Sequence, residues 1–495
     1  MENETEKPKD EEVPSQQTAE EQTEKAKIFK RMSRSERDPG DIPEDFDPFD
    51  PEIRENAPGS ITVFEAFVHL MKGSLGTGIL AMAHGFSYVG LLVGVVGTVI
   101  LISLLGHCIH LILKSQYFQC KRLGIPYIEY PDCMEDAFRN GPTFCRKMAP
   151  AMPYVVDFFM LVYQLGTCSC YFIFIAYSIK AVADMYGFYL HDRVWMTLLL
   201  IPIMLLNLIR DLHRLAPVST AGNVFFVMAM CVIYYYLFGY DGSAFDHIGD
   251  RPLIVWPPTR WPLFIGTACF ALESIAIVVK IEHHMKQPKK FRQPIGVFNV
   301  ALVVTCILFA MTGLCGYLKY GDGAKSSLTL NIAEDQILAQ VVKLLYGLVI
   351  FFSYPIQNFV PLELLWKNYI KQHMTDYPED KKIRIEYFFR EFIVLVTWAF
   401  AMIIPHLDLL ISLFGAFCLA SLGIIFPVLI HILVLKSEKK SFGFMNWILI
   451  KDMLLIAFGV FIMVSGTIIS LLDIFTAIEK DFQTKPDSVS QLFES

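Results

Sequence analysis

Three glycines gather in the first long apolar segment, directly after two ionisable side chains. Gly73, Gly76 and Gly78 fall within six residues of FEAFVHLMKGSLGTGILAMAHG. Glycine weakens a helix and lets the backbone approach a ligand, and the N–H groups at the start of a following helix favour an anion. His69 and Lys72 precede these glycines. Ionisable side chains cost free energy when they lie in an apolar span, so their presence there indicates a functional role before a structural one. The alternative is a close helix–helix contact between small residues.

A carboxyl group interrupts a second apolar segment, FIGTACFALESIAIVVK. It belongs to Glu273, and Lys280 follows it near the end of the segment. Glu273 either carries a proton or braces the core, and both readings stay open. For Lys280 we favour extension to the membrane surface over a pair with Glu273.

Other potential ligands make a weaker pattern. His107 and His110 share a helix face, whereas Cys168 and Cys170 do not, and no third ligand accompanies either pair. The sequence contains no P-loop and no HExxH motif. We therefore expect no metal, no cofactor and no enzyme.

The composition indicates that these segments cross a membrane as helices. Of the 495 residues, 54% are apolar and only 18% are charged, with a mean hydropathy of +0.45. A soluble domain is nearer 25% charged, and about 20 apolar residues span a bilayer as a helix. We predict an all-α integral membrane protein with eleven transmembrane helices. The predicted spans are 62–88, 89–113, 151–179, 194–209, 217–239, 261–282, 295–317, 337–365, 388–405, 408–435 and 447–472.

Charge divides the chain into a tail and a membrane body. Residues 1–60 hold 18 acidic and 9 basic residues, whereas the rest holds 31 and 33. This acidic, proline-containing segment buries too little apolar surface to fold, so we expect a disordered cytosolic tail, with Ser33 and Ser35 as possible regulatory sites. The transmembrane domain is predicted over 61–475, and 476–495 form a short C-terminal tail. Nothing in the body resembles the basic footprint of a nucleic-acid binder.

Lys and Arg in the connections set the orientation. With the N-terminus in the cytosol, 22 basic residues fall in cytosolic connections and 8 on the other side. Eleven spans then place the C-terminus in the lumen or outside the cell. The predicted lumenal connections contain none of the eleven cysteines, so no lumenal disulfide is expected.

At these residues the sequence resembles the proton-coupled amino acid transporters of the amino acid/auxin permease group. The resemblance lies in HLMKGSLGTGIL, VVDFFMLVYQLGTCSCYFIF, FIGTACFALESI with EHHMKQPKKF, VKLLYGLVIFF and IPHLDLLISLFGAF. It implies a LeuT-like 5+5 inverted repeat plus one extra helix, with helices one and six discontinuous. The repeats would cover about 62–239 and 261–435, and the extra helix about 447–472.

The resemblance also implies roles for single residues. His69 and Glu273 correspond to the family's proton-coupling positions, and the substrate carboxylate would meet the unwound first helix. The implied substrate-binding residues are Gly73, Ser74, Gly76, Thr77, Gly78, Phe270, Ala271 and Ser274. Two departures stand out: Ala83 and His84 replace a family proline, and Ser274, Ala276 and Lys280 replace glycines and a proline. They predict stiffer half-helices and a smaller or more polar pocket.

The implied function is symport of protons with small neutral amino acids such as glycine, alanine and proline. Protons would be the coupling ion, and the membrane would be the plasma membrane or a lysosomal or endosomal membrane. The alternative is an amino-acid-sensing transceptor of the same fold, with signalling partners recruited through the N-terminal tail.

Overall fold

The computed structural model describes residues 47–48, 61–74, 76–209, 212–240, 242–271, 275–332, 336–374 and 377–483. Within these ranges the regular structure is helical, apart from an isolated β-bridge between Ile61 and Met285. The all-α prediction is therefore confirmed for the described part of the chain.

Each predicted span coincides with a helix or with consecutive helices. The first four spans correspond to α3 (Val63–Ser74) with α4 (Gly78–Ser87), α5 (Leu91–Leu123), α8 (Met152–Ala183) and α9 (Asp192–Asn207). The next four correspond to α10 (Leu212–Phe238), α11 (Trp261–Ala271) with α12 (Ile275–His284), α14 (Val297–Tyr320) and α15 (Ile337–Leu365). The last three correspond to α16 (Glu379–Ile403), α17 (Leu407–Phe414) with α18 (Phe426–Ser437), and α19 (Trp447–Gln483).

By length and apolar composition, seven helical segments among the described residues can cross a membrane. The number is eight if α3 and α4 form one bent span. The short helix α9, the more polar α16, and the pair α11 and α12 are not among them. The count of eleven spans therefore stays a prediction.

Several helices extend beyond the predicted spans. Helix α5 continues ten residues past 113 to Leu123, where Gly124 adopts a left-handed conformation with φ +64° and ends it. Its last turns carry polar side chains that are nevertheless buried. The side-chain amide nitrogens of Gln116 and Gln119 are satisfied there, since they donate to the carbonyls of Ile128 and Cys133. The hydropathy pattern does not reveal this extension, since such buried polar residues resemble a loop. The predicted cytosolic connection after α5 also contains two helices, α6 (Tyr130–Arg139) and α7 (Thr143–Met148).

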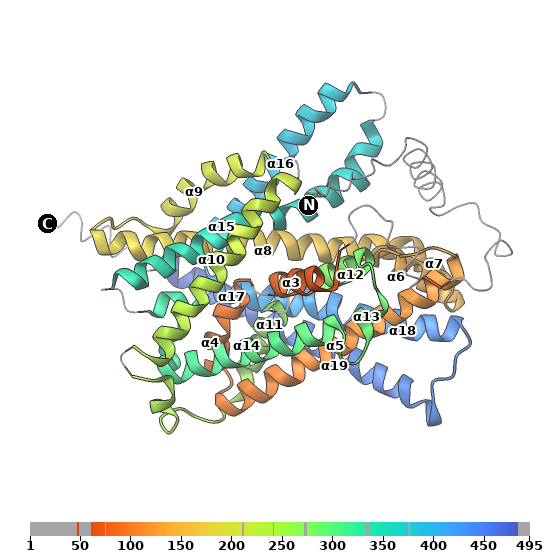
Figure 1. Cartoon of the computed structure of the whole chain (residues 1–495), viewed down its shortest axis with the longest axis horizontal. Helices are drawn as coiled ribbons and strands as arrows, with labels where there is room; N and C mark the ends of the chain where they lie inside the picture. Colours follow the sequence, from red (N-terminus) through yellow and green to blue (C-terminus); the bar gives the residue numbers. More distant parts are fainter. Residues whose placement is uncertain are drawn as a thin grey trace, which may run out of the picture.

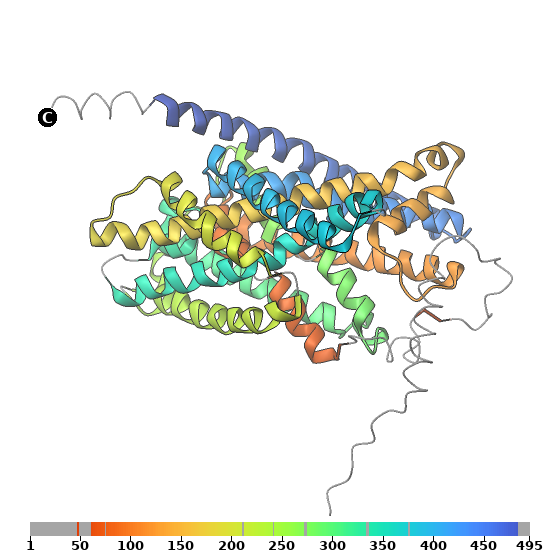
Figure 2. The same cartoon turned by 90° about the horizontal axis from the view of Figure 1, so that it is seen from above.

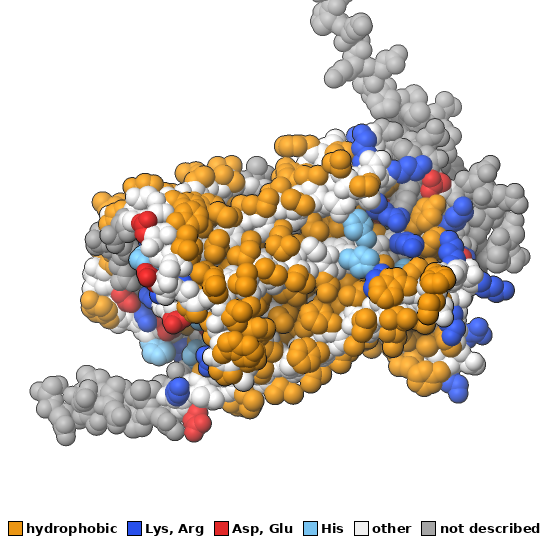
Figure 3. Space-filling model, turned by 90° about the horizontal axis from the view of Figure 1, so that it is seen from below, with side chains coloured by type: hydrophobic (Ala, Val, Ile, Leu, Met, Phe, Trp, Pro, Cys, Tyr) orange, Lys and Arg blue, Asp and Glu red, His pale blue; other side chains and the backbone are white. Residues whose placement is uncertain are grey.

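The long helices run mostly along the longest dimension of the molecule (Figure 1), and α19 lies along one edge of the bundle in the view of Figure 2. Apolar side chains cover the middle of the surface in Figure 3, whereas Lys and Arg gather at one end. We call this the basic end; it carries α6, α7 and α13 (Lys289–Arg292). This segregation agrees with the charge count, and the assignment of the basic end to the cytosol stays a prediction.

Candidate functional site

The first predicted span changes direction at its glycines. Helix α3 ends at Ser74 and α4 begins at Gly78, with an angle of 47° between them. Gly76 and Thr77 lie between the two helices, and Leu75 is outside the described residues. The Tyr346 hydroxyl on α15 donates to the Gly76 carbonyl at 2.9 Å. The connection is thus held by a fully buried side chain of a distant helix.

The start of α4 lies directly against the end of α11. A Cβ atom placed on Gly78 would be 2.5 Å from the Cα of Ala271, so only glycine permits this approach. Phe270, the neighbour of Ala271, is fully buried, and its ring lies edge-on to Tyr163 with 6.0 Å between centroids. The structure therefore brings two predicted substrate positions, Gly78 and Ala271, into contact. Glu273 and Ser274 fall outside the described residues.

Thr77 presents a buried hydroxyl at this junction. Its side chain is 2% exposed, and among the described residues its Oγ1 has no hydrogen-bond partner. Thr77 is the N-cap residue of α4 but makes no side-chain capping bond. An unsatisfied buried polar group costs about 1–3 kcal/mol, and a bound ligand can supply the missing partner. Among the predicted site residues, Thr77 thus offers a buried hydroxyl that is free to bond a ligand.

His69 lies on the exposed side of α3. The buried residues of this helix are Ala66, Leu70 and Ser74, spaced four apart along one face. Successive residues of an α-helix are about 100° apart, so the His69 side chain points away from that face. Gly73 is partly buried on the last turn of α3. The structure places His69 one turn before the glycines, as its sequence position requires, but not against α11.

A second polar group on α4 lies further along the helix. The Nδ1 of His84 is 2.7 Å from the Ala324 carbonyl, and its Nε2 is 2.8 Å from the Tyr88 hydroxyl. The same Nε2 is 3.5 Å from a carboxylate oxygen of Asp408 on α17. Sequence reasoning noted His84 only as a departure from the family pattern. It could not find the pair, because the two residues are 324 positions apart.

Two further helices complete the surroundings of α4. Phe86 occupies a slot between α5 and α14, where a Cβ on Gly94 or on Gly313 would lie 2.6 Å from its ring. Ala83 packs on Gly316 of α14, where a Cβ would lie 2.5 Å from the Ala83 methyl group. The small side chain of Ala83 fits this contact, at the position where the family resemblance predicts a proline.

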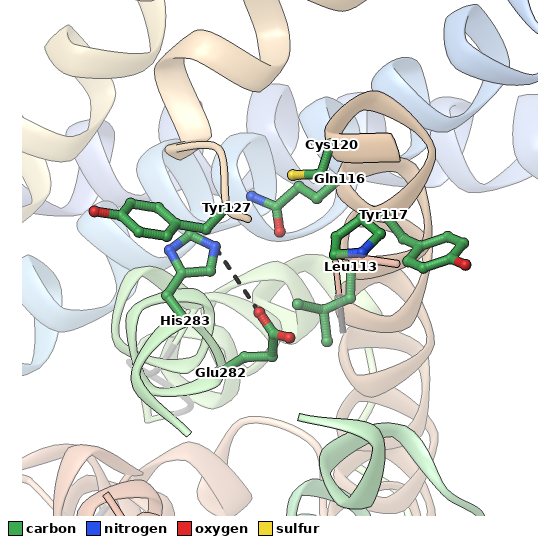
Figure 4. Close-up of a pocket in the computed structure, with 8 residues that line it drawn as sticks. Leu113, Gln116, Tyr117, Cys120, Tyr127, Glu282 and His283 are labelled. Carbon is green, nitrogen blue, oxygen red and sulfur yellow. Dashed lines mark ion pairs between the residues drawn. The ribbon is translucent and has the colours of Figure 1, made fainter. Parts of the chain in front are cut away.

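A pocket at the basic end lies apart from these contacts, between α5 and α12 (Figure 4). His283 stacks on Tyr127 with 5.0 Å between ring centroids, and its Nε2 is 3.9 Å from Glu282. Pro48 of the N-terminal segment also lines the pocket, next to Asp47, which pairs with Lys289 at 3.0 Å. Asp47 and Pro48, which precede the bundle in the sequence, thus touch the basic end.

A charged cluster stabilises the same end. Arg122 of α5 pairs with Asp136 of α6 and with Glu438 after α18, the latter at 2.9 Å. Burial raises the pKa of Asp136, and the adjacent Arg122 counteracts this shift. The cluster joins three elements of the basic end and contains none of the predicted site residues.

Comparison with known proteins settles the family. The family model described as transmembrane amino acid transporter protein matches residues 59–472. The chain belongs to this family. The match covers α3 to most of α19 and confirms the resemblance seen in the sequence.

Two curated members of the family show how similar the chain is. The proton-coupled amino acid transporter-like protein pathetic of Drosophila melanogaster is 32% identical over 437 residues, 88% of this chain and 89% of that protein. Vacuolar amino acid transporter 4 of Saccharomyces cerevisiae is 26% identical over 440 residues, 82% of this chain and 58% of that protein. The chain is thus an amino acid transporter by family.

Among solved structures, a nucleobase-cation-symport-1 family transporter with bound bromovinylhydantoin has a TM-score of 0.48 at 12% identity. The superposition covers 89% of this chain and 96% of that one. Since this likeness is distant, the inverted repeat stays a prediction.

Proposed function

We propose that the protein couples the transport of small neutral amino acids, of the glycine, alanine and proline type, to the movement of protons. The observation that carries the proposal is the junction of Thr77 and Gly78 with Ala271. It places the N-terminus of α4, a buried hydroxyl and the C-terminus of α11 together. The name of the Drosophila relative supports proton coupling.

The junction suits both charged groups of an amino acid. The first N–H groups of α4 have no partner within the helix and carry a partial positive charge, which favours the substrate carboxylate. The last carbonyls of α11 carry a partial negative charge, which favours the ammonium group. The Thr77 hydroxyl can donate to the carboxylate. Backbone groups therefore bind the zwitterion, as the resemblance implied.

The close approach of the helices limits the substrate's side chain. Gly78 and Ala271 leave no space for a Cβ atom between them, and Phe270 closes the adjacent face. Such a junction favours a substrate with a small side chain over a large one. We assign no Lys or Arg of the proposed site to the side-chain carboxylate of an acidic amino acid, so glutamate should compete poorly.

Proton coupling is assigned to His69 and Glu273. Histidine changes charge near neutral pH, and His69 lies on the exposed side of α3. Protonation there would alter the charge one turn before Gly73 and so bias α3 relative to α4. Glu273 remains the second candidate, on the segment that follows Ala271.

Uptake into proteoliposomes tests the proposal. Labelled glycine, alanine and proline should accumulate when an inward proton gradient is imposed and should not accumulate when a protonophore collapses it. Unlabelled alanine should reduce the signal, whereas glutamate and lysine at equal concentration should reduce it much less. Equal competition by glutamate at neutral pH would contradict the proposed pocket.

The second candidate is a transceptor that binds the same amino acids but moves little of them. The contact of Asp47 and Pro48 with the basic end favours this reading, because it links the tail to the bundle. Binding without gradient-driven uptake would support it. We propose a plasma membrane or a lysosomal or endosomal membrane as the location, and the vacuolar name of the yeast relative supports an internal one.

A further inference from the structure

A histidine and an aspartate tie α4 to α17 beyond the proposed substrate site. His84 is six residues after Gly78, about 9 Å along the helix axis, towards the end of the bundle opposite the basic end. Both side chains are mostly buried, with His84 22% and Asp408 27% exposed. The proposed function assigns no role to this pair.

The hydrogen bonds of His84 fix which nitrogen can gain or lose a proton. A carbonyl oxygen only accepts, so Nδ1 must donate to Ala324 and keeps its hydrogen. Nε2 is therefore the nitrogen that titrates, and it faces both Tyr88 and Asp408. A bare Nε2 accepts from the Tyr88 hydroxyl and faces the carboxylate without attraction. A protonated Nε2 makes a charge-assisted contact with Asp408.

The surroundings favour an ionised Asp408 as the partner. Asp408 lies in the first turn of α17, where the helix dipole stabilises a negative charge. Three further charged or titratable residues act on the pair or on Tyr88, one each from the segment before α11, the segment before α17, and α19. They are Arg260, His406 and Asp473.

The pair also bears on the substrate site through α17. Helix α17 continues into Gly415, and a Cβ on Gly415 would meet the Gly266 carbonyl of α11 at 1.8 Å. Helix α17 thus lies directly against α11, while α4 meets α11 at Gly78. A bond from α4 to α17 therefore joins the two elements that flank the site on the side away from the basic end.

We propose that His84 is a proton-binding residue that, when protonated, locks α4 to α17 through Asp408 and closes this end of the bundle over the substrate site. The inference rests on the proposed function, since it adds a proton site to the same transport cycle. It concerns a different residue and a different helix contact from those assigned to His69.

Thermal unfolding of the purified protein tests the proton site without substrate or gradient. The folded protein gains the ion pair only when His84 is protonated, so stability should rise as the pH falls. When the pH is lowered from 7.5 to 5.5, this pair should raise the thermal unfolding midpoint by an increment of about 2–4 °C. His84→Gln and Asp408→Asn should each remove that increment, and the double variant should lose no more than either one. If His84→Gln folds poorly, Asp408→Asn alone carries the comparison.

A matched control comes from an exposed pair at the same end. His247 is 3.2 Å from Asp250, with side chains 43% and 68% exposed, three positions apart in one segment. His247→Gln should keep the pH increment, because an exposed local pair contributes little. An increment that survives His84→Gln, or that His247→Gln removes equally, would overturn the proton site.

Thiol labelling tests the closure. Ser87, one turn after His84, donates to the His84 carbonyl and is partly buried. The labelling rate of Ser87→Cys by a membrane-impermeant maleimide is compared with that of Ser87→Cys/His84→Gln, after subtraction of native-cysteine labelling. At pH 5.5 the double variant should react several-fold faster, and at pH 7.5 the two rates should agree. Equal rates at both pH values would overturn the lock.

The two proposals fail separately. If the rise in unfolding midpoint at low pH is lost in His84→Gln but no amino acid accumulates, the proton site stands and the symport proposal falls. If gradient-driven uptake is found but His84→Gln keeps the rise in unfolding midpoint at low pH, the symport proposal stands and this inference falls.

Discussion

The two helices on either side of the Gly76–Thr77 connection differ sharply in how they are packed. Eight of the ten residues of α4 are buried, whereas α3 buries only Ala66, Leu70 and Ser74 of its twelve. Helix α4 makes backbone-close contacts with α11 and α14 through Gly78 and Gly316. On α3, by contrast, Phe64 is 73% exposed, and the contact of Met71 with Thr305 is a weak 3.8 Å interaction.

One half of the span can therefore move more readily than the other. Displacing α4 would break close-packed contacts on several sides, which interiors resist. Displacing α3 would disturb few buried side chains. We therefore infer that α3, on the side nearer the basic end, is the element that shifts during transport, and that α4 moves only when its contacts near His84 are released.

The largest effect is expected where coupling depends on α3. His69→Ala should abolish proton-driven accumulation, and wild-type uptake should rise as the external pH falls from about 7.5 to 5.5. Because His69 is exposed, the variant should fold and insert normally, as gel filtration and thermal unfolding would show. Glu273→Gln is the parallel variant. A full pH response in His69→Ala together with its loss in Glu273→Gln would assign the proton to the carboxylate.

The second-largest effect is expected where α4 is packed most closely against α11. Gly78→Ala should destabilise the protein by about 1–3 kcal/mol, because the added methyl group meets backbone atoms of Ala271 that cannot rotate away. Gly222→Ala on α10 is the matched control, since a Cβ there would meet no atom within 4 Å among the residues that the structure describes. It should leave stability unchanged or raise it slightly. Equal midpoints for both variants in thermal unfolding would contradict the close contact.

A smaller effect should separate binding from stability at the junction. Thr77→Val keeps the side-chain shape but removes the hydroxyl, so the apparent substrate affinity should fall about tenfold, or ~1.4 kcal/mol, without loss of stability. Tyr346→Phe removes the bond to the Gly76 carbonyl and should instead cost about 1 kcal/mol of stability. Binding titrations and unfolding on the same samples give both readings. A Thr77→Val variant that loses stability but binds normally would make Thr77 structural.

The smallest effect concerns the tail at the basic end. Asp47→Lys should change stability by less than about 0.5 kcal/mol, since an exposed ion pair contributes little. It should still speed proteolysis of the N-terminal segment, and Asp47→Lys/Lys289→Asp should restore the slower rate. Unchanged proteolysis in the single variant would show that the contact does not hold the tail.

The positions of the helices were predictable from the sequence, because long apolar runs report burial in lipid or core directly. The glycine cluster likewise coincides with the 47° bend between α3 and α4, while a discontinuous transmembrane helix stays a prediction. The helices α6 and α7 were not predictable from hydropathy, since both are short and carry several charged residues, and α7 buries none of its side chains. The amphipathic pattern of YPDCMEDAFR is the signal that could have found α6.

At the site, Gly78 and Ala271 were named as substrate positions only through the family resemblance; the fold shows that they are in contact, and their role stays a prediction. The pairing of His84 with Asp408 was beyond it, because contact between distant segments depends on how α4 and α17 pack. Two cues were present: a histidine inside an apolar segment and an aspartate at the start of the next-to-last span. Neither cue identifies its partner without the fold.

The most direct test of the central claim is to measure whether α3 moves while α4 stays in place. Spin labels at Val68 on α3 and Val303 on α14, both exposed, would report α3. Labels at Ser87 on α4 and Ile307 on α14 would report α4. At pH 5.5, where the His84 lock is closed, addition of alanine should shift or broaden the first distance distribution and leave the second unchanged. Lowering the pH from 7.5 to 5.5 should narrow the distance distribution between the labels on α4 and α14 without moving its mean. A second distribution that shifts with alanine while the first stays fixed would contradict the account.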